Sequence, residues 1–154
     1  MKHIIFKLIL IISLAINISG CYFVSFEDVS SLSNYSQYVG KNYKSQSPTI
    51  IYRVSFDLNY KPEPSHYVIK SPPGFSGPEV ISRKELPTGT TFEVLKVFKC
   101  TNCFLDFKER VKLIVKLTST ELFNDREVEI NIEQIGGTFI PLTVKAANNA
   151  VKQD

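Results

Sequence analysis

The sequence predicts an all-β fold, mainly antiparallel, built as a small barrel or sandwich of five or six strands. Three observations predict this class. Apolar and polar residues alternate over several short segments, as they do in strands with one buried face. Gly, Pro and Asn residues that favour turns separate these segments. No long segment has the apolar spacing of an amphipathic helix.

The first element, residues 1–20, has the organisation of a secretory signal peptide. Lys2 and Lys7 make the start of the chain basic. The apolar stretch 8–18 that follows is too short for a membrane span, which needs about 20 residues. The stretch ends in Ile18-Ser19-Gly20-Cys21, an aliphatic residue, two small residues and a cysteine. It resembles the lipobox of bacterial lipoprotein precursors. The resemblance implies a lipid on the thiol of Cys21 and cleavage before it; the alternative is an ordinary cleaved signal with an incidental cysteine.

The lipobox resemblance also implies a localisation in the cell envelope, with the membrane as a partner through the lipid on Cys21. In enteric bacteria an Asp after the cysteine tends to retain a lipoprotein in the inner membrane, whereas this chain has Tyr22. The analogy favours the periplasmic face of the outer membrane where the organism has one. Without Lys2 and Lys7 the remaining chain has 16 basic and 15 acidic residues. Such a balance, with no dense basic face, argues against a nucleic-acid partner.

We predict that residues 21–40 are a tether from the membrane with a short helix. The segment is rich in Ser, Asn, Gln and Tyr, which suits a solvated linker. Within it, apolar residues recur at helical spacing, and Gly40 is placed to end a helix. These apolar residues are Val29, Leu32, Tyr35 and Val39.

Residues 41–146 form the predicted β domain, and the polar tail 147–154 follows it. The segment 50–60 alternates strictly, with Ile50, Tyr52 and Val54 among the residues on its expected buried face and Ile51 on the solvent face. A long loop is expected over 71–90. The other expected strands are 67–70, 91–100, 110–117, 127–135 and 139–144.

The stretch ELPTGTTFEVLKV, residues 85–97, carries one further resemblance. It resembles an element of bacterial Src-homology-3-like barrels, in which a loop ending in Gly-Thr leads into an alternating strand. The resemblance implies a barrel and covers about a tenth of the chain.

Cys100 and Cys103 form a C-x-x-C motif between two predicted strands. A β-turn brings its ends within about 7 Å, and disulfides span Cα distances of about 4.4–6.8 Å. An exported chain meets oxidising conditions. We therefore predict a disulfide; reduced thiols, a metal site or redox activity are the alternatives. A metal site is disfavoured because zinc needs three or four ligands and His66 is the one histidine outside the leader.

The stretch SPPGFSGPEV, residues 71–80, is the predicted partner-binding element. Prolines stiffen the loop and lower the entropy lost on binding, and an aromatic anchor is a typical hot spot. Phe75 is either that anchor or a lid that folds back over an open barrel end. With LPTGT and the C-x-x-C motif, this stretch resembles uncharacterised small envelope lipoproteins. The predicted contact residues are Pro72, Pro73, Phe75 and Pro78.

These features predict a non-catalytic, lipid-anchored binding module that meets an envelope protein or polymer. An immunity or inhibitor lipoprotein, or a secretion or assembly component, has this size and address. The alternative is an envelope hydrolase, or another enzyme, that uses His66 and nearby acids. A catalytic His needs a nucleophile and an orienting acid, and the chain has no G-x-S-x-G motif. We predict no cofactor, no metal and no catalytic residue.

Overall fold

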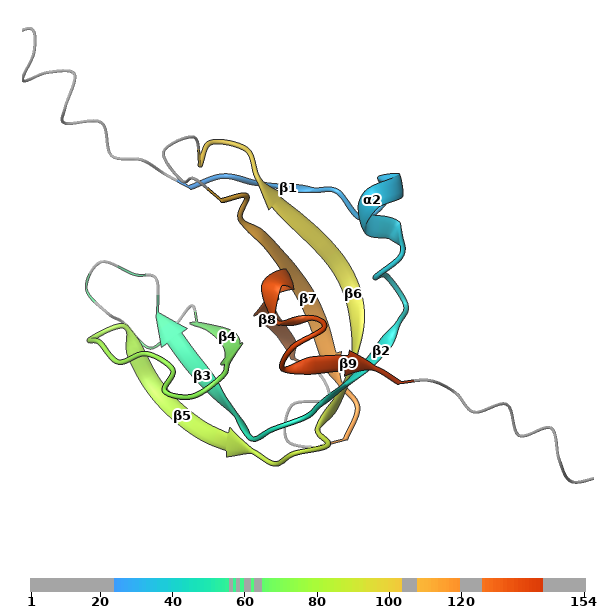
Figure 1. Cartoon of the computed structure of the whole chain (residues 1–154). Coiled ribbons are helices and arrows are strands. Elements are labelled where there is room, and N and C mark those ends of the chain that lie inside the picture. Colours follow the sequence, from blue (N-terminus) through green and yellow to red (C-terminus); the bar gives the residue numbers. More distant parts are fainter. Residues whose placement is uncertain are drawn as a thin grey trace, which may run out of the picture.

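The computed structural model of the chain describes residues 24–55, 57, 59, 62, 65–103, 108–119 and 126–142. Its described residues form nine strands in one sheet, a short α-helix and a 3-10 helix (Figure 1). The strands are β1 (Phe26–Asp28), β2 (Asn42–Ser45), β3 (Thr49–Ser55), β4 (Ser65–Lys70), β5 (Val80–Leu86), β6 (Thr91–Cys100), β7 (Val111–Leu117), β8 (Glu127–Asn131) and β9 (Phe139–Pro141). The helices are α2 (Ser33–Ser36) and η2 (Ile132–Gln134).

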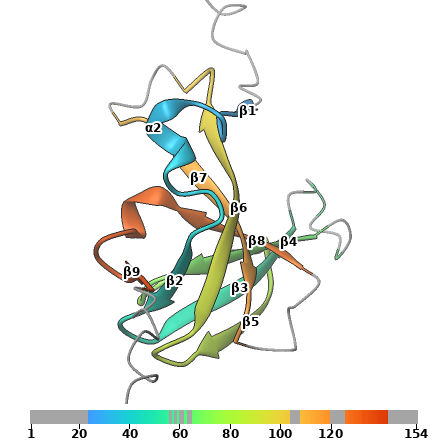
Figure 2. The ribbon, with the colours of Figure 1, turned by 90° about the vertical axis from the view of Figure 1, so that its right-hand side faces the viewer.

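The sheet runs in the order β5-β3-β4-β8-β7-β6-β2-β9, and β1 pairs with the far end of β6. All pairs between these strands are antiparallel except β4 with β8, which is parallel. The sheet curves strongly but does not close into a barrel. In both views β1 and α2 lie at one end of the molecule and β5 lies toward the other (Figures 1 and 2).

The main core lies on the concave side of this sheet. Alternate residues of the central strands are buried there, which confirms the strands predicted at 110–117 and over the first part of 127–135. Aromatic rings fill the space between β6 and the strands β2 and β9. Phe92 stacks on Tyr43, with ring centroids 5.7 Å apart, and meets Phe139 edge to face at 4.9 Å.

β3 is buried on both faces, and this overturns part of the prediction for residues 50–60. Ile51, which we expected on the solvent face, is 2% exposed and belongs to the main core. Tyr52 and Val54 form a second cluster with Val68 on the other face, under the loop 71–79. The alternation is real, but the second face is covered by this loop. The remaining positions of the expected buried face of this segment, 56, 58 and 60, lie outside the described residues.

Three strands appear where none was predicted, so the expected five or six strands are too few. β1 and β2 lie before residue 49, and β5 occupies part of the expected loop 71–90. The segment 24–40 is therefore built into the domain and is not a simple tether. Val29 is 4% exposed in the main core, and the predicted short helix is α2.

β8 is shorter than the strand predicted over 127–135, because it ends at Asn131, where the helix η2 begins. Asn131 caps η2: its side chain accepts a hydrogen bond from the Glu133 N–H at 3.0 Å, and its own N–H donates to the Gln134 side chain at 3.2 Å. This reciprocal pair is a capping box, which fixes the start of a helix. Gly136 then turns the chain with φ +87°, a conformation that glycine adopts readily because it has no Cβ.

Candidate binding loop and its surroundings

The loop 71–79 lies over the convex face of β3, opposite the main core. Phe75 stacks on Tyr52 with ring centroids 4.4 Å apart and an interplanar angle of 29°. Offset stacking at this separation is favourable and adds to the apolar area buried. Phe75 therefore folds back onto the sheet in the manner of a lid, while its side chain remains half-buried rather than fully enclosed.

Gly74 makes this close approach possible. Its φ is +72°, a conformation that residues with a Cβ rarely adopt. A methyl group at Gly74 would overlap the hydroxyl oxygen of Tyr52 and come within 2.8 Å of its ring carbon Cζ. The Tyr52 side chain is fully buried, and its hydroxyl has no hydrogen-bond partner among the residues that the structure describes. The chain thus holds the loop against Tyr52 by shape and not by a polar contact at this hydroxyl.

Hydrogen bonds fix both ends of the loop. At its start, Ser71 Oγ lies 2.7 Å from Thr138 Oγ1, and the Gln134 side-chain amide donates to Ser71 Oγ at 3.3 Å. At its end, the Ser55 N–H donates to the Glu79 carbonyl at 2.8 Å. The loop is therefore tied to η2, to the segment before β9, and to the end of β3.

The register of β3 places charged residues around the Tyr52 cluster. Residues directly opposite one another in a ladder share a face. Val54 faces His66 on β4, while Tyr52 faces Arg83 and Ile50 faces Glu85 on β5. His66, Arg83 and Glu85 are exposed. The cluster itself is covered by the loop, so the loop and these charged side chains form the exposed surface, and a polar rim is typical of a protein–protein contact surface.

The predicted contact residues fall into two groups in this arrangement. Pro72, Pro73 and Pro78 are exposed, whereas Phe75 is half-buried against Tyr52. The structure therefore brings Phe75 to the sheet and leaves the prolines at the surface. Sequence reasoning missed Tyr52 and Gly74 as the residues that hold the loop, although a glycine after two prolines beside an aromatic residue was visible in the sequence.

The structure joins the two predicted cysteines in a disulfide. Cys100 and Cys103 have Cα atoms 5.8 Å apart, within the range that disulfides span. Cys100 is the last residue of β6, so the bridge closes the turn at the end of this strand. Cys21, the predicted lipid site, lies outside the described residues.

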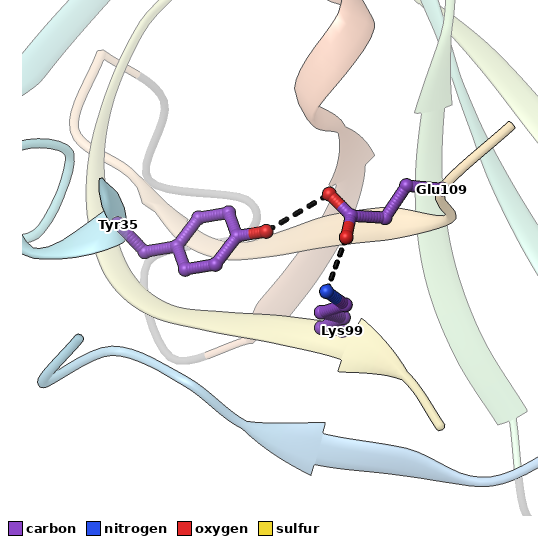
Figure 3. A network of polar contacts seen from close by, with 3 residues as sticks. All are labelled: Tyr35, Lys99 and Glu109. Carbon is purple, nitrogen blue, oxygen red and sulfur yellow. Dashed lines mark hydrogen bonds and ion pairs between the residues drawn. The ribbon is translucent and has the colours of Figure 1, made fainter. Parts of the chain in front are cut away.

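A polar network lies beside this turn (Figure 3). The Tyr35 hydroxyl donates to Glu109 Oε2 at 3.0 Å, and Lys99 forms an ion pair with Glu109 Oε1. Hydrogen bonds from Lys99 and then from Tyr35 lower the pKa of Glu109, while burial and the contact with Glu109 raise the pKa of Tyr35. The network ties α2 to β6 and to the segment before β7.

The Glu109 network predicts a pH-dependent difference in stability. A carboxyl with a lowered folded-state pKa stabilises the fold above its unfolded pKa, and this contribution is lost as pH falls through the folded pKa. Glu109→Gln should therefore lower the urea midpoint slightly at pH 7 and leave no difference at pH 2. A difference that persists unchanged at pH 2 would contradict this assignment; Glu127→Gln, at an exposed position on β8, is the control.

No metal-binding cluster is found in the part of the chain that the structure describes. No group of three or more His, Cys, Asp or Glu residues there could hold a metal ion. His66 lies opposite Val54 in the ladder between β3 and β4. Within the same residues, none of the helices has the length and hydropathy of a membrane span. The chain has no match among protein-family models, curated proteins or solved structures.

Proposed function

We propose that the protein is a lipid-anchored binding module of the cell envelope that recognises an envelope protein through the loop 71–80. The observation that carries the proposal is the preorganised loop: Phe75 and Gly74 lock it onto Tyr52, and its prolines stay exposed. A surface that is already ordered loses less entropy on binding. An immunity, inhibitor or assembly role fits this design.

In this proposal some residues contact the partner and others position the loop. Pro72, Pro73 and Pro78 supply contacts, and Arg83 and Glu85 supply charged positions at the rim. Phe75 positions the loop through Tyr52 and adds its exposed edge to the surface. A ring that serves both purposes makes binding and stability change together, so Phe75→Ala alone does not separate them.

The loop proposal is tested by photo-crosslinking in the source bacterium. A benzophenone amino acid at Ser76, an exposed loop residue, is expected to give one discrete crosslinked product; the same amino acid at Ser47, in the exposed β2–β3 turn, should not. Pro78→Ala should weaken the Ser76 product, whereas Pro87→Ala, at an exposed proline outside the loop, should not. Equal crosslinking at Ser76 and Ser47 would contradict the proposal.

The proposed anchor makes a separate prediction. Cys21→Ser should abolish labelling by a fatty-acid probe and leave an uncut precursor, because the thiolate is the nucleophile that takes the lipid. Several acyl chains hold a protein on a membrane far more firmly than one, at about 0.8 kcal/mol per buried CH₂. The double variant Cys100→Ser/Cys103→Ser should still be labelled. Equal labelling of wild type and Cys21→Ser would sink the assignment.

A further inference from the structure

The folded domain begins very close to the proposed lipid. Phe26, the first residue of β1, is five positions after Cys21. A chain extends at most about 3.6 Å per residue, so the two Cα atoms are no more than about 18 Å apart. β6 alone, with ten residues, is about 30 Å long. The tether is thus shorter than the domain, and it limits which part of the surface reaches the membrane.

The start of the described chain is fixed to one end of the molecule. The Ser25 N–H donates to the Asn102 side chain at 2.8 Å, and its carbonyl accepts from the Thr101 N–H at 2.9 Å. β1 pairs with the last residues of β6. Both views place β1, α2 and the turn after β6 at this end (Figures 1 and 2). We call it the β1 end, defined by residues 24–36, 99–103 and 108–110.

Exposed apolar side chains gather on the same segment. Among the described residues, the large hydrophobic side chains that are exposed are Val24, Leu32 and Leu142. Val24, 49% exposed, lies two residues before the start of β1, and Leu32, 53% exposed, is the N-cap of α2. Lys108 also lies at this end; its side chain is 83% exposed, and its Nζ lies 3.9 Å from Glu133 Oε1 of η2. Exposed apolar side chains suit the boundary between lipid headgroups and acyl chains.

We infer that the β1 end is the membrane-contacting surface of the protein, with Val24 and Leu32 seated in the headgroup region of the bilayer. This inference rests on the proposed lipid at Cys21. In this orientation the β1 end contacts the membrane, and β6 extends from the membrane toward the opposite end of the domain. The turn between β2 and β3, beyond the paired residues Lys44 and Thr91, lies at the distal end.

The test uses the full chain, expressed in bacteria, purified from membranes and reconstituted into phosphatidylethanolamine–phosphatidylglycerol vesicles. Lys108→Cys and Ser47→Cys each add one free thiol, because lipid blocks Cys21 and the disulfide occupies Cys100 and Cys103. Each thiol receives an NBD fluorophore. Lipids with a nitroxide headgroup should quench the label at 108 several-fold more strongly than the label at 47, and the emission at 108 should shift to the blue.

A second arm tests the apolar contacts. Val24→Asp/Leu32→Asp should reduce quenching at position 108, whereas the matched Leu142→Asp should not. Leu32 is an N-cap without a side-chain hydrogen bond, where Asp is favoured, so this change keeps the fold. Circular dichroism checks that the variant is folded. The comparison of quenching at positions 108 and 47 in the protein with Val24 and Leu32 unchanged does not depend on this variant.

The outcomes separate the inference from the proposed function. Mass spectrometry that shows no lipid on Cys21 overturns both the anchor and this orientation. A lipid on Cys21 with equal quenching at 108 and 47, or with stronger quenching at 47, overturns the orientation alone. Unchanged quenching at 108 in the folded Val24→Asp/Leu32→Asp protein overturns the seating of these side chains. Loss of crosslinking at Ser76 bears on the binding loop and leaves the orientation standing.

Discussion

Gly74→Ala is expected to lower the free energy of unfolding by about 2–5 kcal/mol. Two effects combine. A residue with a Cβ at φ +72° costs about 1–2 kcal/mol, and a methyl group that overlaps the Tyr52 hydroxyl forces the loop or the ring to shift, which costs about 1–3 kcal/mol. Urea denaturation measures the sum of the two costs.

The chain offers a control that separates strain from overlap. Gly89 has φ +85°, but a Cβ there would meet nothing within 4 Å. Gly89→Ala should therefore show the conformational cost alone, about 1–2 kcal/mol. If Gly74→Ala destabilised the protein no more than Gly89→Ala, the close contact of the loop with Tyr52 would be wrong.

Removal of the Tyr52 hydroxyl should partly rescue the Gly74 variant. The hydroxyl is buried with no hydrogen-bond partner in the described part of the chain, so Tyr52→Phe alone is expected to be neutral or slightly stabilising. In the double variant Tyr52→Phe/Gly74→Ala the closest overlapping atom is gone, and the double-mutant cycle should show a favourable coupling. Additive effects of the two changes would contradict the contact.

Phe92→Ala is expected to cost about 3–5 kcal/mol, against a typical total stability of about 5–15 kcal/mol. Phe92 is fully buried between Tyr43 and Phe139, so truncation leaves a cavity that the sheet cannot collapse to fill. Phe98 lies on the same strand and is only partly buried. Phe98→Ala should therefore cost clearly less in the same urea titration; equal costs would mean that the facing of β6 is wrong.

The central strands could be predicted because their two faces differ. In β7, Val111, Leu113 and Val115 are buried and alternate with less buried residues, which is the pattern that a sequence shows directly. β5 could not be predicted this way. Its residues Ser82 to Glu85 are all exposed, because β5 is an edge strand that pairs with β3 alone. β1 has only three residues and owes its place to pairing with β6.

The position of the loop 71–80 in the sequence could be predicted, but its conformation and its contacts could not. Prolines and glycines between two strands identify residues 71–80 as an unusual loop. They do not say what Phe75 touches, because its partner Tyr52 belongs to a strand that is buried on both faces. A strand of this kind hides one face under a loop, so alternation alone cannot tell which face meets the main core.

The partners of Ser25 have a consequence for the order in which the domain folds. Its hydrogen-bond partners Thr101 and Asn102 lie 76 and 77 residues further along the chain. A chain that emerges amino end first therefore leaves Ser25 without these partners until residue 102 has emerged. β1 and the central strand β6 must then come together late, after most of the chain has been made available. Under the proposed pathway, the enzymes that act at Cys21 can therefore meet the chain before β1 has docked.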